Sequence, residues 1–346
     1  MRKLQEEYPE EKLVGFFYDP NIHPYSEYQL RLLDVKRSCK MLNIDLIEGE
    51  YDYEGWIKAV RGLENEPEKG ARCDVCFDNR LESTAKEALK LGEKSISTTL
   101  LTSPKKSIEQ LKAVGDSIYK KYSIEFVAPD FRKNGGTQEQ FALAKEDMLY
   151  HQDYCGCIYA LTAQRDQQKR LADELFSPIS RQVQPESIEE RIELYTKRIE
   201  LEDQKIKYKI IREKFLNYRL LRGFVKQNGK VINSYFLSYS KTKRKLIKAK
   251  VAHEIEDKHF LNRENILFIS LETFNNLLDY EYKSIDDLCL NPPSFEDEIE
   301  IRSKLIKTAF SLSPIIVLNN IDNSAKYQIY CDSISYEDMR EILVTF

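Results

Sequence analysis

The sequence lacks any long apolar run, and this absence excludes a membrane-spanning helix. No stretch of about 18 consecutive apolar residues occurs in the chain of 346 residues. The segment 1–7 also lacks the apolar core of a secretion signal. The net charge of -4 excludes a generally basic protein that coats nucleic acid, but not a local basic groove. We therefore expect a cytoplasmic protein with no membrane partner.

An even set of cysteines, typical of a disulfide framework, is absent as well. The chain has seven cysteines, and without a secretion signal they indicate a reducing compartment. Four of them form two closely spaced pairs, Cys73-Asp-Val-Cys76 and Cys155-Gly-Cys157. In a reducing compartment, such pairs more often bind a metal or undergo redox chemistry than form structural bridges.

The first half of the chain alternates apolar, strand-like runs with amphipathic stretches. Strands are expected at 13–18, 44–48, 96–101 and 124–128, and helices at 26–42, 53–61, 78–91, 105–120 and 137–150. This alternation predicts an α/β domain over residues 1–165, with a parallel sheet covered by helices on both faces. The fold would be similar to the HUP or ATP-pyrophosphatase type, with the active site at the carboxyl ends of the strands.

The order of elements at the N-terminus departs from this pattern. An α/β unit normally opens on a strand, whereas residues 2–8 look like the end of a helix. We therefore expect that one strand and about one helical turn of the fold precede Met1.

The pattern of apolar and polar residues changes after residue 165, and residues 166–346 predict an accessory α+β domain. Ser187 and Glu190 form a capping box, which is expected to open a long helix over 187–222 that stops at Gly223. Asn228-Gly229 predicts a hairpin, because both residues tolerate the positive φ of a tight turn. Short strands are expected at 266–271, 315–318 and 327–331.

Several chemistries remain open for the cysteine pairs. Two sulfurs spaced as in Cys73 and Cys76 can grip one metal or one edge of a cluster, or form a reversible disulfide. A disulfide between Cys155 and Cys157 would be strained and easily reduced, which suits electron transfer. Alternatively, all four sulfurs hold one structural zinc.

Charged and polar neighbours add candidate groups. Arg72 and Arg80 flank the first pair and would favour a thiolate or an anionic cluster, unless they are ordinary surface groups. His23 follows a strand and could donate to a substrate, and His151 precedes Cys155 and could donate a proton. Each histidine is otherwise a structural hydrogen-bonding group. Asp19 and Asp130 are candidate acids at strand ends, or else loop caps.

Five segments of the chain resemble the QueH-type epoxyqueuosine reductases, which are metal-dependent and do not use cobalamin. The segments are residues 17–28, 72–77, 98–104, 129–131 and 151–159. They follow one another in the family's order and at its spacing over roughly residues 10–160. Residues beyond about 165 lie outside the family's common core.

The resemblance implies the last step of queuosine synthesis. In that step the epoxide oxygen is removed reductively from epoxyqueuosine at the tRNA wobble position, giving queuosine and water. It implies tRNAs of the His, Asp, Asn and Tyr acceptors and an external electron donor as partners. It also implies a [4Fe–4S] cluster, with a further mononuclear iron in some members. Cys73 and Cys76 would be cluster ligands, and Cys155 and Cys157 a redox-active pair or additional ligands.

One family feature is missing from this sequence. The family's N-terminal strand ends in an adjacent pair of cysteines that completes the cluster, and the chain has no such pair. The pair would fall in the segment expected before Met1. Either translation starts further upstream, or this is a truncated form that cannot hold the usual cluster.

Contacts to substrate are expected from polar and basic residues near the strand ends. Asn21, His23, Arg72, Arg80 and Lys133 are the candidates for substrate binding, and Asp130 and His151 for the catalytic acid. The basic run 241–250, Lys105-Lys106 and Arg132-Lys133 are candidate phosphate contacts or simply solvated charges.

Two other functions fit the same pattern less fully. A zinc-stabilised RNA-binding protein without catalysis would use the cysteines structurally. An ATP-pyrophosphatase would need a Ser-Gly-Gly phosphate loop, and no such loop is visible.

Overall fold

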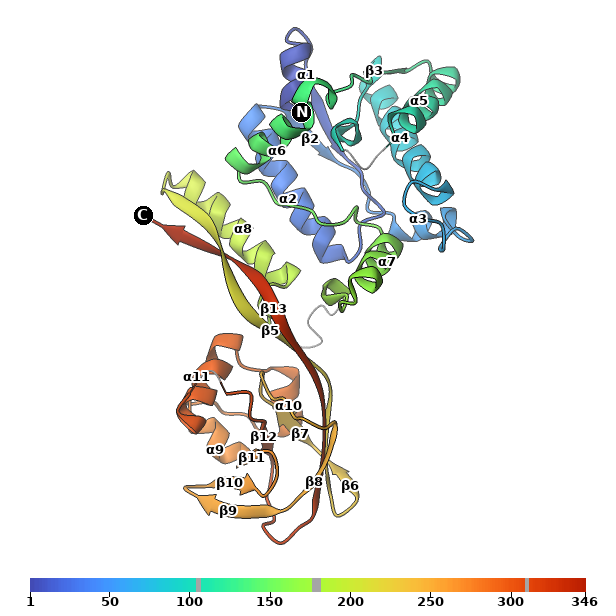
Figure 1. The fold of residues 1–346 in the computed structure, drawn as a ribbon. Helices are drawn as coiled ribbons and strands as arrows, with labels where there is room; N and C mark the ends of the chain where they lie inside the picture. Colours follow the sequence, from blue (N-terminus) through green and yellow to red (C-terminus); the bar gives the residue numbers. More distant parts are fainter. Residues whose placement is uncertain (104–106, 176–181, 309–310) are drawn as a thin grey trace. The chain divides into compact units, whose positions relative to one another are not determined.

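The computed structural model describes residues 1–103, 107–175, 182–308 and 311–346 (Figure 1). The described chain forms two compact units. The first comprises 1–175, 191–210 and 345–346, and the second comprises 182–190 and 211–344. None of the described helices is long and apolar enough to cross a membrane.

The first unit contains two parallel pairs of strands, as the sequence predicts. Strands β1 (Val14–Phe17) and β2 (Asp45–Glu48) pair in parallel and are joined through helix α2 (Tyr25–Leu42). Strands β3 (Ser95–Ile96) and β4 (Glu125–Phe126) pair in parallel and are joined through helix α5 (Ile108–Tyr122). Within the described residues these are two separate two-stranded sheets, whereas the prediction was one sheet.

The remaining elements of the first unit are short helices, apart from α4. They are α1 (Arg2–Glu7), α3 (Tyr53–Ala59), α4 (Ala71–Leu91), the 3-10 turns η1 (Thr99–Thr102), η2 (Lys133–Gly135) and η3 (Asp173–Leu175), α6 (Gly136–Glu146), α7 (Ile158–Gln168) and α8 (Ile188–Asp203). Two predictions were wrong here. Helix α4 begins at Ala71 instead of residue 78, and the strand expected over 96–101 ends at Ile96. The hydroxyl of Thr98 accepts from the Leu100 N–H, which favours the 3-10 turn.

The packing of α4 against α5 forms the core beneath β3 and β4. Buried side chains recur on one face of each helix at helical spacing. They are Phe77, Leu81, Ala85 and Ala88 on α4, and Leu111, Val114 and Ile118 on α5. A side chain at Gly115 would overlap the Phe126 ring, with the nearest atom at 2.3 Å, so glycine allows α5 to approach β4 closely.

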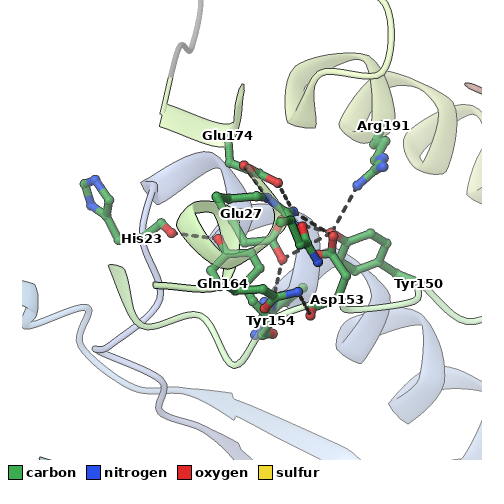
Figure 2. Close-up of polar contacts among 11 residues, drawn as sticks. His23, Glu27, Tyr150, Asp153, Tyr154, Gln164, Glu174 and Arg191 are labelled. Carbon is green, nitrogen blue, oxygen red and sulfur yellow. Dashed lines mark hydrogen bonds and ion pairs between the residues drawn. The ribbon is translucent and has the colours of Figure 1, made fainter. Parts of the chain in front are cut away.

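A buried polar network ties the segment 150–154 to α2 (Figure 2). The Glu27 carboxylate accepts from Arg31 Nε at 2.7 Å and from the Tyr150 hydroxyl at 3.0 Å. Burial raises the pKa of Glu27, while the Arg31 charge acts in the opposite direction. The Tyr154 hydroxyl donates to the His23 carbonyl at 2.7 Å. These bonds fix the chain just before the Cys155-Gly-Cys157 turn, because every partner is buried or partly buried.

The long helix predicted over 187–222 was wrong in its second half. Helix α8 ends at Asp203, Lys205 adopts a left-handed φ of 57°, and strand β5 runs from Tyr208 to Gln227. The region after Lys205 is rich in aromatic and β-branched residues, which favour a strand once it can pair. The capping box is present in part: the Ser187 hydroxyl accepts from the Glu190 N–H at 3.2 Å.

Helix α8 also contributes to the first unit. Arg198 Nη2 lies 2.6 Å from an oxygen of Asp34 on α2, and Arg37 pairs with Glu202 at 2.7 Å. Arg198 is fully buried, so its charge depends on Asp34 and on the Met148 carbonyl, which accepts from Nη1 at 2.7 Å.

The second unit contains two sheets. One has the order β6 (Lys230–Ile232), β5, β13 (Tyr327–Thr345) and β8 (Leu246–Ala249). The other has the order β7 (Ser234–Phe236), β12 (Ile315–Leu318), β11 (Leu267–Ser270), β10 (Lys258–Leu261) and β9 (Val251–Ile255), in which only β11 and β12 pair in parallel. Asn228 and Gly229 link β5 to β6 with φ of 48° and 88°, which confirms the predicted hairpin.

Alternating side chains of the five-stranded sheet divide the second unit into layers. Phe268 and Ile316 pack with Val225 of the four-stranded sheet in one core. Their neighbours Leu267 and Val317 pack in a second core. Helices α9 (Leu271–Asn275), α10 (Ile285–Leu290) and α11 (Phe295–Ile306) supply the rest of that second core. One sheet therefore lies between the other sheet and a helical layer.

The ion pairs of Glu82 link α4 to α5 and predict a pH-dependent stability. Its carboxylate accepts from Lys121 at 2.9 Å and from the Tyr122 hydroxyl at 2.7 Å. These bonds lower the pKa of Glu82 to about 2. A depressed folded-state pKa contributes stability above the ordinary value of 4.5. We expect Glu82→Gln to destabilise the protein at neutral pH, and this difference to vanish as pH falls towards 2.

Urea unfolding followed by the fluorescence of Trp56, the single tryptophan, measures this difference. Glu10→Gln is the control, because Glu10 is exposed and makes no ion pair among the described residues. A difference between wild type and Glu82→Gln that stays constant down to the lowest pH would contradict the expectation.

Candidate functional site

The first cysteine pair lies in the first turns of α4. Gly70 caps the helix, and its carbonyl accepts from the Cys73 N–H at 2.8 Å. A spacing of three residues puts Cys73 and Cys76 on one side of the helix. The Lys69 N–H donates to the Cys73 sulfur at 3.2 Å. The N-terminal end of a helix carries partial positive charge, which favours thiolates over thiols.

The second cysteine pair forms a turn that is fixed against the loop after β1. The Asn21 side chain donates to the Cys155 carbonyl at 3.2 Å, and the His23 N–H donates to the Gly156 carbonyl at 2.9 Å. Gly156 has a φ of 96°, and a side chain there would lie 2.7 Å from Ile22. The turn is therefore held by hydrogen bonds from Asn21 and His23 and by steric contact with Ile22.

Three of the four paired cysteines pack in one cluster of side chains. Cys76, Cys155 and Cys157 pack with Trp56 and Tyr159 at the start of α7. Cys157 is hydrogen-bonded to Cys155. Cys73 instead contacts the core between α4 and α5. The fold thus joins segments about eighty residues apart into one thiol site, which we call the sulfur cluster (Cys76, Cys155 and Cys157).

Burial raises the pKa of Cys76 in this sulfur cluster, and a hydrogen bond and burial raise that of Cys157. Part of the Cys76 residue is exposed, but its sulfur is enclosed, and burial raises its pKa to about 11 despite the nearby Arg80 charge. The hydrogen bond with Cys155, followed by burial, raises the pKa of Cys157 strongly. Cys157 therefore keeps its proton at neutral pH.

A buried ion pair borders the sulfur cluster. Asp19, two residues after the end of β1, pairs with Arg80 of α4, which lies four residues, or about one helical turn, beyond Cys76. Burial raises the pKa of Asp19, and Arg80 opposes this effect. Asp19 in turn contributes to the raised pKa of Cys76. A carboxyl group, a guanidinium and a thiol thus act on one another at the carboxyl end of β1.

Trp56 and Asn21 each hold a buried polar atom that faces this region. The Trp56 N–H acts on the Cys76 thiol and favours its thiolate, although their contact falls outside ordinary hydrogen-bond geometry. The Asn21 Oδ1 is buried and has no hydrogen-bond partner in the described ranges. Sequence reasoning missed Trp56, whose only signal was that it is the sole tryptophan of the chain.

The other predicted site residues lie in several settings. The His23 ring stacks on Tyr53 at 5.0 Å, and partial burial lowers its pKa, so the ring is neutral at neutral pH. Arg72 is buried and donates to the carbonyls of residues 63, 64 and 66 at 3.1, 2.9 and 2.6 Å. Its charge also lowers the pKa of Cys157. His151 is exposed and contacts none of the four cysteines in the described structure.

Asp130 and Lys133 line an open pocket of about 480 Å³ that includes none of the cysteines. Its lining residues are Ile108, Glu109, Lys112, Asp130, Arg132 and Lys133. The Asp130 carboxylate lies 3.8 Å from both Arg132 and Lys133. Lys105 and Lys106, predicted as phosphate contacts, lie outside the described residues.

The first cysteine pair is compatible with part of a metal site. Across the described ranges, no group of three or more His, Cys, Asp or Glu side chains is arranged to hold a metal ion. Cys73 and Cys76 lie on one side of α4 near its N-terminus, which suits two thiolate ligands. A [4Fe–4S] cluster takes four, so these residues fit half of that ligand set.

A set of buried thiols at the strand ends of an α/β unit defines a class of protein, namely thiol- or metal-dependent enzymes. Comparison with known proteins specifies the family. Residues 1–163 match the family described as "Epoxyqueuosine reductase QueH". A protein of that name from Helicobacter pylori is 41% identical over 334 residues, covering 92% of this chain and 89% of the relative. The chain belongs to the QueH epoxyqueuosine reductase family.

Other relatives match less than half of the chain. The epoxyqueuosine reductase QueH of Thermotoga maritima is 39% identical over 160 residues, which are 45% of this chain and 83% of the relative. That of Acinetobacter baylyi is 41% identical over 147 residues, or 42% of this chain and 67% of the relative. The match to the Helicobacter pylori protein, at 92% of this chain, therefore extends into the second unit, whereas these two matches are shorter than the first unit.

The contact of Gly156 with Ile22 predicts a large effect of a single methyl group. Gly156→Ala adds an atom 2.7 Å from Ile22 to a residue with positive φ, so we expect the Cys155-Gly-Cys157 turn to shift. The control is Gly92→Ala, which has a similar φ of 77° but no atom within 4 Å of the added carbon. We expect Gly156→Ala to lower stability by about 1–3 kcal/mol more than Gly92→Ala.

Trp56 packs with the cysteines, so its emission reports on their cluster during urea unfolding. We expect Gly156→Ala to change this emission in the folded state, and Gly92→Ala to leave it unchanged. Equal losses of stability in the two variants would show that Ile22 does not restrain the turn.

Proposed function

We propose that this chain converts epoxyqueuosine in tRNA to queuosine. The reaction breaks both carbon–oxygen bonds of the epoxide, forms a carbon–carbon double bond and releases the oxygen as water. It consumes two electrons and two protons. The observation that carries the proposal is the sulfur cluster, found within the part of the chain that matches a family of epoxyqueuosine reductases.

Cys155 and Cys157 are suited to supply both electrons and both protons. Oxidation of two thiols to one disulfide releases two electrons and two protons, which balances the removal of the epoxide oxygen. A strained Cys-Gly-Cys disulfide would then be easily reduced by an external dithiol or another low-potential donor. The hydrogen bond with Cys155 and burial raise the pKa of Cys157, so this thiol can carry one of the protons that the reaction consumes.

Cys73 and Cys76 are proposed as two ligands of a [4Fe–4S] cluster, with its other ligands from outside this pair. A cluster bound there would supply electrons at low potential. The Lys69 N–H donates to the Cys73 sulfur, and the Trp56 N–H lies near Cys76. Both groups favour the thiolate form of the cysteine beside them. We also propose an additional mononuclear iron, to which no ligands are assigned.

Asp19 is the acid that the geometry favours. Burial raises the pKa of its carboxyl group while Arg80 opposes this effect, and the carboxyl group acts electrostatically on Cys76, so we assign proton donation beside the sulfur cluster to Asp19. Asp130 and His151 stay predictions for this role, since Asp130 lines a separate pocket and His151 is exposed.

Asn21 and His23 are proposed to position the substrate. The unpaired Asn21 Oδ1 is a buried acceptor that a substrate donor group can satisfy, which removes the cost of leaving it unbonded. The neutral His23 ring can donate or accept a hydrogen bond. Arg80 and Lys133 remain candidates for substrate binding. Arg72 has less capacity for this role, because three carbonyls occupy one of its nitrogens.

Serine substitutions test the proposed roles of the cysteines. We expect Cys155→Ser and Cys157→Ser each to abolish reduction, because a dithiol cannot form. The measurement is the loss of one oxygen from the modified nucleoside, followed by mass spectrometry of digested tRNA. The matched control is Cys289→Ser, which changes an exposed cysteine in the second unit and should leave turnover unchanged.

A second readout separates the two cysteine pairs. We expect Cys73→Ser and Cys76→Ser to remove bound iron and visible absorption, and Cys157→Ser to retain both. A colourless wild-type protein that binds one zinc and shows no turnover would instead support the zinc-stabilised RNA-binding function.

A further inference from the structure

One face of the four-stranded sheet in the second unit carries aromatic and basic side chains that the fold does not use. Along β5, Val225 is buried in the core, so Phe224 and Lys226 point to the opposite face. A side chain at Gly223 would meet the Phe236 ring at 3.0 Å, which places this residue on the core side as well. We call the opposite side the outer face, defined by Arg222, Phe224, Lys226, Val231, Leu246, Lys248, Gln328 and Tyr330.

Strands β8 and β13 extend the same face. Ile247 and Ile329 are paired and buried in the core, whereas the flanking pairs are Leu246 with Tyr330 and Lys248 with Gln328. These flanking residues therefore point outward. Leu246 is 49% exposed, and on β6 the outward Val231 is 63% exposed, so no described part of the second unit covers this side of the sheet.

Two stacked aromatic rings lie in the middle of the outer face. The rings of Phe224 and Tyr330 are parallel within 3°, with centroids 5.1 Å apart. The Arg222 guanidinium lies 5.4 Å from each ring centroid, and the Lys226 ammonium lies 5.7 Å from that of Phe224. Aromatic rings and guanidinium planes are the surfaces on which unstacked bases stack.

The charge of this face is positive. Arg222, Lys226 and Lys248 pair with no carboxylate in the described ranges. The acid that neighbours them on β13, Asp332, is already paired with Lys245 at 2.6 Å. Three cations around an aromatic surface match the phosphates and bases of a single strand, whereas the whole chain is acidic with a net charge of -4.

We propose that the outer face binds an unpaired segment of the tRNA substrate, with a base stacked on Tyr330 and phosphates near Lys248 and Lys226. The inference rests on the proposed function for the identity of the RNA. It goes beyond that function in assigning RNA contact to the second unit. The predicted basic run 241–250 contributes to it through Lys248, which pairs with Gln328 two residues from Tyr330.

The test measures binding separately from reduction. Full-length protein is titrated with an unmodified tRNA transcript, a single-stranded oligoribonucleotide and the same oligonucleotide in a duplex. Tyr330→Leu keeps an apolar side chain but removes the ring, and should weaken single-strand binding about tenfold. Lys248→Gln should lower the slope of log affinity against log salt by about one for each RNA.

Lys283→Gln is the matched control, because Lys283 is exposed beside α10, in the helical layer behind the five-stranded sheet. It should change neither quantity. Circular dichroism and thermal melting check that every variant is folded. The proposal is overturned if Tyr330→Leu and Lys248→Gln bind all three RNAs like wild type, or if Lys283→Gln weakens binding as much as Lys248→Gln.

Turnover of epoxyqueuosine-containing tRNA by the same variants distinguishes the two proposals. Wild-type turnover together with unchanged RNA binding in all variants would overturn the outer-face proposal and leave the reductase intact. Weakened RNA binding by Tyr330→Leu, in a wild-type protein that reduces nothing, would support the outer face and sink the reductase.

Discussion

The contact between two turns determines the geometry of the whole thiol site. Asn21 and His23, after β1, bond the carbonyls of Cys155 and Gly156, and Ile22 fills the space that a side chain at Gly156 would need. Without this contact, Cys155 and Cys157 would belong to a loop far along the chain from α4. The buried network of Glu27 and Tyr154 stabilises this contact, because the Tyr154 hydroxyl donates to the His23 carbonyl (Figure 2). Buried polar groups that are hydrogen-bonded to one another admit few alternative arrangements.

Sequence patterns predicted the elements that local forces determine. Strand β1, helix α2 and the Asn228-Gly229 hairpin follow from periodicity and turn chemistry, and the structure confirms them. The helix expected to continue to residue 222 was wrong, because pairing with neighbouring strands overrides a helical pattern in β-branched sequence. The approach of Cys76 to Cys155 depends on tertiary packing, so spacing alone could mark both pairs as chemical but could not join them.

The two units present different kinds of surface for one reaction. The first contains the thiols and an enclosed carboxyl group, both of which need low exposure to water. The second presents flat rings and free cations, which need exposure to reach a polyanion. A modified base at an anticodon is small compared with the RNA that carries it. A separate RNA-contacting surface therefore lets the thiol site remain enclosed while most of the binding free energy comes from elsewhere.

The family match ends before helix α8, although most of α8 belongs to the first structural unit. The family match ends at residue 163, yet Arg198 and Glu202 of α8 pair with Asp34 and Arg37 of α2. A fragment cut at the end of the match would leave Asp34, which also accepts from the Tyr150 N–H, without its buried cation. A chimera joined at the end of the match would therefore require compensating changes along α2 even where the cysteines are identical, because the partners of Asp34 and Arg37 lie beyond the joint.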